Sequence, residues 1–356
     1  MTKYKLEIIT LERSNYIKNL LNDFPEKDIH YYPDYLKLFE DFLGTKGIYV
    51  FYGDDKNYII TPYFERPVST GAQNSEYIDL VSIWYFGGPI HNIQDKKLLP
   101  DVFQNFRKVF NEYCQENNVV SEFQRFNPIL GNYKLFQNDP SLYYNRENVY
   151  VDLKKDLEIL YNEYSRHVRK NINKAKRYRL KVYHSENRES ISKFIEIYSE
   201  AMKKKKAKDF YYFNETFFNN LFKIFKEEAK LFQVEYDGKI ISSSIELGKY
   251  GILYDYLRGS NPRYFDLRPN DILIDEIIKW AKFNNYKYFV LGGGNSSSLK
   301  DGLFKFKKSF SSTTADFYVY KKIHNLGEYK RLCKIHGKKQ DSLEYEKALF
   351  FPEYME

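Results

Sequence analysis

Cysteine is scarce in this chain, since its 356 residues include only Cys114 and Cys333. Neither belongs to a C-x-x-C pair or lies near a histidine at ligand spacing, which argues against a disulfide framework and a zinc site. The six histidines form no H-E-x-x-H or H-x-H cluster, and no G-x-S-x-G motif occurs. We therefore expect no metal, and a Ser-His-Asp or metal-dependent hydrolase has no support.

Long apolar runs are also missing. No stretch of the sequence approaches the roughly 20 apolar residues that a membrane span requires. The N-terminal sequence MTKYKLEIITLERSNY has no apolar core and no small-residue cleavage site, so we expect no signal peptide. Together with the low cysteine content, this favours a cytoplasmic protein.

The residues that are abundant are aromatic and charged. There are 35 Tyr and 29 Phe, so a single tyrosine is weak support for a ligand site. The 56 Lys and Arg outnumber the 48 Asp and Glu, giving a formal net charge of +8. This excess is compatible with an anionic partner such as a phosphate, a nucleotide, tRNA or an acidic membrane face.

The length predicts two domains. An order of strand, helices, antiparallel meander, helix and strand occurs once in 1–150 and again in 151–325, and a polar helical tail follows in 326–356. This alternation predicts an α/β (α+β) fold, in which each half has a mixed, mostly antiparallel sheet flanked by helices. The halves share this order but no visible sequence identity.

A basic helix is predicted over 164–179. Val168, Ile172 and Ala175 form its buried stripe, whereas Arg166, Arg169 and Lys170 are among the cations on its other faces. Such a face can hold a phosphate or a carboxylate. A solvated surface without a ligand is an equally good interpretation.

Two further segments could carry chemistry. The strand that begins at Leu253 runs into Gly259-Ser-Asn-Pro, where we expect it to leave its neighbour and offer backbone N–H groups to an oxyanion. An ordinary turn remains the alternative. Three glycines follow Leu291, but they form neither a Walker A loop nor a Rossmann fingerprint, and a flexible loop is the alternative there.

These segments and two others carry a resemblance over about residues 25–320. In chain order they are Tyr85-Phe-Gly-Gly-Pro-Ile, Ser121-Glu-Phe-Gln-Arg-Phe-Asn-Pro, Ser165-Arg-His-Val-Arg-Lys-Asn-Ile-Asn-Lys-Ala, Arg268-Pro-Asn-Asp-Ile-Leu, Leu291-Gly-Gly-Gly and Gly302-Leu-Phe-Lys-Phe-Lys-Lys-Ser-Phe. Their order and spacing resemble the Fem-type (FemAB-like) peptidoglycan-bridge aminoacyltransferases and related GNAT-type acyltransferases.

The resemblance implies two tandem GNAT-type domains and attack of an amine on an activated acyl carbonyl. It implies no tightly bound cofactor, but acyl-CoA or aminoacyl-tRNA as co-substrate. Two family features are missing. Residues 187–228 have room for two ordinary helices only, not for a long helical arm. No R/Q-x-x-G-x-G/A pyrophosphate loop follows the strand at 253–260.

From the motifs we name Lys307 and Asp255 as candidate catalytic residues, for charge stabilisation and for accepting a proton. The candidate substrate-binding residues are Arg166, Arg169, Lys170, Tyr254, Tyr256, Arg258, Arg268, Asn295 and Phe306. Strand alternation predicts that Tyr254 and Tyr256 lie on one face and Asp255 on the other.

The function that this implies is transfer of an acyl or aminoacyl group onto an amine of a cell-envelope glycan or peptidoglycan precursor. One alternative is an acetyl-CoA-dependent N-acetyltransferase that acts on a nucleotide-linked amino sugar. Another is a non-catalytic module that binds tRNA or a glycan. The sequence leaves tRNA and a peripheral membrane contact open as further partners.

Overall fold

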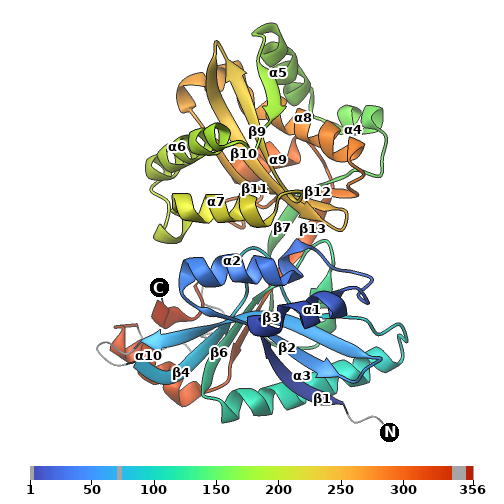
Figure 1. The fold of residues 1–356 in the computed structure, drawn as a ribbon, viewed down its shortest axis with the longest axis vertical. Coiled ribbons are helices and arrows are strands. Elements are labelled where there is room, and N and C mark those ends of the chain that lie inside the picture. The colour runs from blue at the N-terminus through green and yellow to red at the C-terminus, as the bar shows by residue number, and fades with distance from the viewer. Residues whose placement is uncertain (1–3, 70–73, 339–349, 356) are drawn as a thin grey trace. The chain divides into compact units, whose positions relative to one another are not determined.

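The computed structural model describes residues 4–69, 74–338 and 350–355. The chain divides into two compact units (Figure 1). Unit 1 comprises Met1–Asn145 and Asp316–Glu356, and unit 2 comprises Arg146–Ala315. The sequence predicts domains at 1–150 and 151–325, whereas the structure returns the chain to unit 1 at residue 316. Part of the predicted tail, 339–349, lies outside the described residues.

Unit 1 is built on a mixed sheet. Its helices are α1 (Ser14–Leu21), α2 (Pro33–Leu43), α3 (Leu98–Glu116) and α10 (Leu326–Ile335), and its strands are β1 (Lys5–Thr10), β2 (Lys46–Gly53), β3 (Tyr58–Ser69), β4 (Asn74–Val81), β5 (Ile90–His91), β6 (Val119–Arg125) and β13 (Thr314–Ile323). The strand order is β1-β2-β3-β4-β6-β13, with β5 beside β3. The β4–β6 pair is parallel and the other pairs are antiparallel.

Unit 2 repeats this plan. Its helices are α4 (Leu157–Glu163), α5 (Arg166–Arg177), α6 (Arg188–Lys205), α7 (Glu215–Ile224), α8 (Pro269–Phe283) and α9 (Gly302–Lys308), and its strands are β7 (Leu142–Asp152), β8 (Lys181–His184), β9 (Ala229–Tyr236), β10 (Lys239–Lys249), β11 (Ile252–Ser260) and β12 (Tyr288–Gly292). The order is β8-β9-β10-β11-β12-β7. Only β11 and β12 run parallel among these described strands.

The two sheets therefore have the same architecture. An antiparallel meander leads through a helix, α3 or α8, into a parallel neighbour, and a sixth antiparallel strand completes the sheet. That sixth strand is β13 in unit 1, from late in the chain, and β7 in unit 2, which precedes the rest of its unit. The predicted class, mixed and mostly antiparallel sheets flanked by helices, is confirmed.

The basic helix α5 forms as its apolar spacing predicts. Val168, Ile172 and Ala175 are buried in the core of unit 2, together with residues of α8. The Ser165 side chain caps the helix by accepting from the Val168 N–H at 3.2 Å. Asn171 donates to Asp271 of α8 at 2.9 Å, so one buried polar contact also joins the two helices.

Helix α6 lies directly against β11, at Gly259. A Cβ atom at this position would come within 2.8 Å of the Tyr198 backbone nitrogen and Cα. Only glycine allows this close approach, which holds α6 over the end of the strand.

Unit 1 contains a buried network around Glu122. Arg107 donates to its two carboxylate oxygens at 3.1 and 2.8 Å, Tyr63 donates at 2.6 Å, and His324 Nε2 lies 3.1 Å away. Burial alone would raise the pKa of Glu122, but the Arg107 and His324 contacts hold this pKa well below its usual range. Glu122 is therefore an ionised carboxylate whose compensation depends on Arg107.

We expect Arg107→Met to lower the free energy of unfolding by about 3–5 kcal/mol, because it leaves the Glu122 charge buried without its main partner. Urea denaturation followed by circular dichroism measures this change. The control is Lys37→Met, which removes exposed ion pairs to Glu40 and Asp41 and should cost less than about 1 kcal/mol. Equal costs for the two variants would contradict the role of Arg107.

Candidate functional site

The most informative place in unit 2 is where β11 and β12 part. Their parallel register covers three pairs, Ile252 with Tyr288, Leu253 with Phe289 and Tyr254 with Val290. Beyond these pairs β11 continues to Ser260, still paired with β10, while β12 ends at Gly292. The sequence places the end of pairing at Gly259-Ser-Asn-Pro, whereas in the structure β11 leaves β12 after Tyr254 and stays paired with β10 to Ser260. In unit 1, by contrast, β4 ends at Val81, where its last parallel pair lies.

A β-bulge in β11 changes which side chains share a face of the sheet at this point. Glu246 of β10 pairs with Asp255, but the next residue, Ile245, pairs with Leu257. Tyr256 is the extra residue, and after it the faces are exchanged. Asp255 and Arg258, although three apart, thus lie on the same face.

The bulge gathers four polar side chains into a cluster. Arg258 donates to Asp255 at 3.0 Å and to Ser244 Oγ at 3.4 Å. Ser244 Oγ donates to Glu246 Oε1 at 2.5 Å and lies 3.5 Å from Asp255. Simple alternation would put Arg258 on the face of Tyr254, and the bulge places it with Asp255 instead.

Glu246 was not foreseen from the sequence. Its side chain is fully buried, and its Oε2 atom has no hydrogen-bond partner among the described residues. Burial, and next the charge of Asp255, raise the pKa of Glu246 well above its ordinary value. A signal was present, since Ser242, Ser243, Ser244 and Glu246 interrupt a strand that is otherwise apolar.

Lys307 brings a cation to this cluster from α9. The Asp301 side chain caps α9 by accepting from Leu303 and Phe304 N–H, and Phe304 anchors the helix in the core. Lys307 Nζ donates to the Gly293 carbonyl at 2.9 Å. Burial lowers the pKa of Lys307 to about 8; Asp255 opposes this shift, while Arg258 and Lys205 reinforce it.

The glycine segment after β12 is closely packed. Gly292 has a φ of +82°, and a Cβ at Gly293 or Gly294 would lie 2.8 Å or less from Asn148, Arg146 or Asp301 atoms. Its carbonyls accept from cations, Gly293 from Lys307 and Gly294 from Arg146 at 2.7 Å. The glycines therefore permit close packing against two cations, which favours this role over a flexible loop.

The other candidate residues lie elsewhere in unit 2. Tyr254 and Tyr256 are buried, and half-buried Phe306 packs on Phe310. Asn295 is exposed, and Arg268 precedes α8 in a left-handed conformation.

The three candidates on α5 have different surroundings. Arg166 and Lys170 are exposed. Arg169 donates to the Asn162 and Tyr164 carbonyls at the end of α4, at 3.0 and 2.6 Å. Of the predicted site residues, Asp255 and Arg258 are in contact, and Lys307 lies close enough for both charges to act on its pKa.

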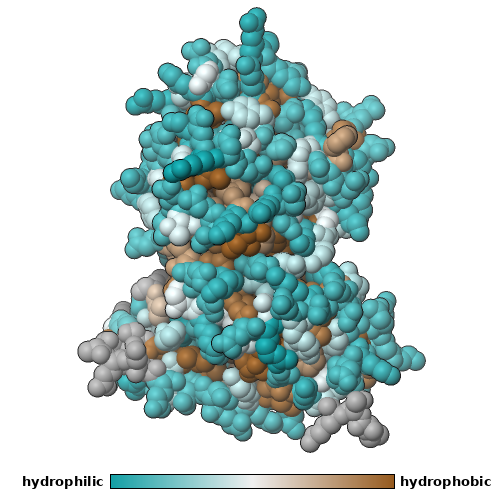
Figure 2. All heavy atoms as spheres, viewed as in Figure 1, coloured by the Kyte–Doolittle hydropathy of each residue, from teal (hydrophilic) through white to brown (hydrophobic). Residues whose placement is uncertain are grey.

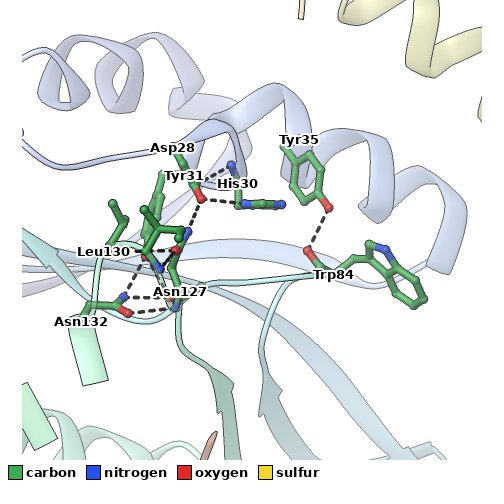
Figure 3. Close-up of polar contacts among 10 residues, drawn as sticks. Asp28, His30, Tyr31, Tyr35, Trp84, Asn127, Leu130 and Asn132 are labelled. Atoms are coloured by element: carbon green, nitrogen blue, oxygen red, sulfur yellow. Dashed lines mark hydrogen bonds and ion pairs between the residues drawn. The ribbon is translucent and has the colours of Figure 1, made fainter. Parts of the chain in front are cut away.

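In unit 1, two sequence motifs meet in one buried clamp (Figure 3). Asp28 accepts from the His30 backbone and from its Nδ1, each at 2.9 Å, and also from Asn127. Asn132 and Tyr31 both donate to the Gly87 carbonyl at 2.9 Å. These contacts hold the loop that carries Gly87-Gly88-Pro89.

Packing explains why glycine occupies position 88. Its φ is +87°, and a Cβ there would lie 2.5 Å from Phe126 and 2.8 Å from Asn132. The two unit 1 motifs thus shape a loop pair, and we assign them no chemistry.

Residues 162–308 match the family described as the acetyltransferase (GNAT) domain. This match lies wholly within unit 2. Its candidate acidic and basic residues, from Glu246 to Lys307, all lie within the matched range. No curated protein matches the chain.

Solved structures share the fold across both units. FemX is 14% identical with a TM-score of 0.67, and the match covers 92% of this chain and 99% of that one. L-PGS from Bacillus licheniformis is 14% identical with a TM-score of 0.56 and coverages of 87% and 92%. The C-terminal domain of a putative lysylphosphatidylglycerol synthetase from Agrobacterium fabrum is 14% identical with a TM-score of 0.55 and coverages of 89% and 92%.

At 14% identity the solved structures establish the fold only, and the match to the acetyltransferase (GNAT) family indicates the type of reaction. Together they confirm the predicted resemblance to Fem-like GNAT acyltransferases and the predicted enzyme class, an acyltransferase. Within the described residues, no group of three or more His, Cys, Asp and Glu side chains could hold a metal ion. In the same residues, no helix has the length and apolar character needed to span a bilayer.

We expect Lys307 to react with an amine-directed acylating reagent with a pH midpoint near 8, because only the neutral amine is nucleophilic. Lys305, exposed on the same helix, is the internal control. Mass spectrometry of labelled peptides across pH 6–11 follows both residues in one sample. A shared midpoint would contradict the lowered pKa of Lys307.

For Glu246→Gln we expect a higher free energy of unfolding than the wild type at pH 8. A carboxyl whose folded pKa is raised contributes stability below its unfolded pKa, here 4.5, and loses it as the pH rises through the folded pKa. The advantage of the variant should therefore vanish toward pH 4. Chemical denaturation at several pH values tests this, with exposed Glu227→Gln as control; an advantage independent of pH would count against it.

Proposed function

We propose that the chain transfers an acyl or aminoacyl group onto an amine of a cell-envelope glycan or peptidoglycan precursor. The observation that carries this proposal is the cluster of Asp255, Arg258 and Lys307 at the parting of β11 and β12, inside the GNAT domain. The shared fold with FemX supports a cell-wall acceptor. The acyltransferase class favours this reaction over the non-catalytic binding module.

The cluster supplies what amine acylation needs. As the amine nitrogen attacks the acyl carbonyl carbon, an N–C bond forms and the carbonyl electron pair moves to oxygen. Lys307 in its ammonium form can stabilise that oxyanion. The bond to the leaving group then breaks, and the leaving group takes the electron pair.

The amine must also lose a proton. The Asp255 carboxylate is the proposed acceptor, and Arg258 at 3.0 Å fixes its orientation. With a pKa of about 8, Lys307 is mostly an ammonium at neutral pH and gives up its proton more readily than an ordinary lysine, so it can donate a proton to the leaving group. Because the two groups lie in one cluster, proton uptake and release can occur in the same site.

A second candidate is an acetyl-CoA-dependent N-acetyltransferase that acts on a nucleotide-linked amino sugar. The matched family, described as an acetyltransferase domain, favours a CoA donor. The Fem-type resemblance favours an aminoacyl-tRNA donor, with tRNA as a partner. Both reactions use the same chemistry at the carbonyl, so the donor distinguishes them.

Purified protein should be assayed with acetyl-CoA and with aminoacyl-tRNA, each against an amino-sugar nucleotide and a peptidoglycan precursor. We expect turnover with one donor, and a loss of roughly 10²–10³-fold in kcat for Lys307→Ala because oxyanion stabilisation is removed. Lys305→Ala should retain wild-type kinetics. For Asp255→Asn, we expect the rise of kcat with increasing pH to be lost or shifted, because the proposed proton acceptor is gone.

Near-normal kinetics in Lys307→Ala would remove this residue from the mechanism, and an unchanged pH–rate profile would remove Asp255 as the base. Thermal unfolding of each variant separates lost chemistry from lost folding.

A further inference from the structure

The positive charge of the chain is concentrated in one segment. Residues 164–184, which we call the basic segment, contain eight Lys and Arg and no Asp or Glu. The whole chain has 56 Lys and Arg and 48 Asp and Glu, so outside the basic segment the two signs balance. The basic segment covers α5 and β8 and the turn between them.

These cations have little internal compensation. In the described part of the chain, Lys181, 3.7 Å from Glu235, is the one Lys or Arg of the basic segment in an ion pair, and His184 lies 3.5 Å from Glu186. Arg166, Lys170, Lys176, Arg177 and Arg179 are exposed.

The carboxylates of α8, which packs on α5, have partners other than the Lys and Arg side chains of the basic segment. Asp275 and Glu276 pair with Lys279, and Asp271 accepts from Asn171. The positive face of α5 is therefore open to an external anion.

Part of this face is hollowed. Lys170, Asn173, Lys176 and Arg177 line a shallow open depression on α5. Three cations and an amide around one hollow suit a phosphate group, which accepts several hydrogen bonds from such donors. The surrounding surface of α5 is hydrophilic (Figure 2).

Apolar side chains protrude from the neighbouring helices. Phe283, the last residue of α8, is 87% exposed, and Leu157 and Ile159 of α4 are 44% and 49% exposed. The end of α8 lies close to the start of α4, since Lys282 donates to the Leu153 carbonyl at 2.9 Å. Figure 2 shows a small apolar patch where Figure 1 draws α4 and this end of α8.

We propose that the face of unit 2 formed by α4, α5 and the end of α8 binds the surface of an anionic phospholipid bilayer. The basic segment attracts the phosphate layer, because each Lys or Arg near an anionic lipid surface adds to the binding. Phe283, Leu157 and Ile159 enter the interface between headgroups and acyl chains. A nucleic acid would satisfy the cations but would leave the aliphatic side chains of α4 in water, so the bilayer fits both observations.

The test is cosedimentation of the full chain with vesicles of phosphatidylcholine, alone or with 30% phosphatidylglycerol. We expect binding to the anionic vesicles only, weakening as NaCl rises from 50 to 300 mM because salt screens the attraction. The triple variant Lys176→Gln, Arg177→Gln, Arg179→Gln should lose roughly 10- to 100-fold in vesicle affinity. Phe283→Ser, at an exposed site, should also bind more weakly at fixed salt.

The matched control is Lys203→Gln, Lys223→Gln, Lys226→Gln, which removes the same charge from exposed positions of unit 2 outside the basic segment. It should stay within about twofold of the wild type, since a local surface and not net charge decides binding. Failure to bind anionic vesicles at 50 mM NaCl overturns the proposal, as do equal losses in the two triple variants. Binding of bulk tRNA through Lys176, Arg177 and Arg179 without vesicle binding would identify a nucleic-acid surface instead.

Discussion

One extra residue in β11 determines how the candidate site is assembled. Tyr256 interrupts the pairing with β10, and for this reason Asp255 and Arg258 share a face with Ser244 and Glu246. Without the bulge, the arginine would lie on the opposite face of the sheet from the carboxylate it contacts at 3.0 Å. Bulges are frequent next to active sites because they redirect a side chain at small cost.

The buried charged groups near this bulge have fewer opposite charges and hydrogen bonds than is usual in a protein interior. Glu246 is buried with one oxygen unbonded in the described residues, and burial, reinforced by Arg258, lowers the pKa of Lys307 to about 8. Such an arrangement costs stability, and it gives proton donors and acceptors whose pKa values differ from their ordinary ones. Unit 1 has the same strand order, but the buried carboxylate of Glu122 is compensated by Arg107, as expected of a structural pair.

Periodicity in the sequence was enough to predict the duplicated sheets and the stripe of Val168 and Ile172 in α5, but the expected end of pairing at Gly259-Ser-Asn-Pro lies beyond the point where β11 leaves β12. It could not predict the exchange of β13 into unit 1, because pairing of distant strands leaves no local pattern. Periodicity also did not identify Glu246 as a site residue, because its neighbours Ser244 and Asp255 are set by the pairing register of β10 and β11. The motif residues around Gly88 carry packing contacts, which a motif alone cannot separate from chemistry.

The central claim is that Asp255 and Lys307 act as one site in acyl transfer. A double-mutant cycle on kcat/KM, with Asp255→Asn, Lys307→Ala and both together, tests it most directly. We expect the double variant to be about as active as the less active single variant, because the effects of substitutions at residues that work as a unit are strongly non-additive. Losses that simply multiply would show two independent groups and contradict the account.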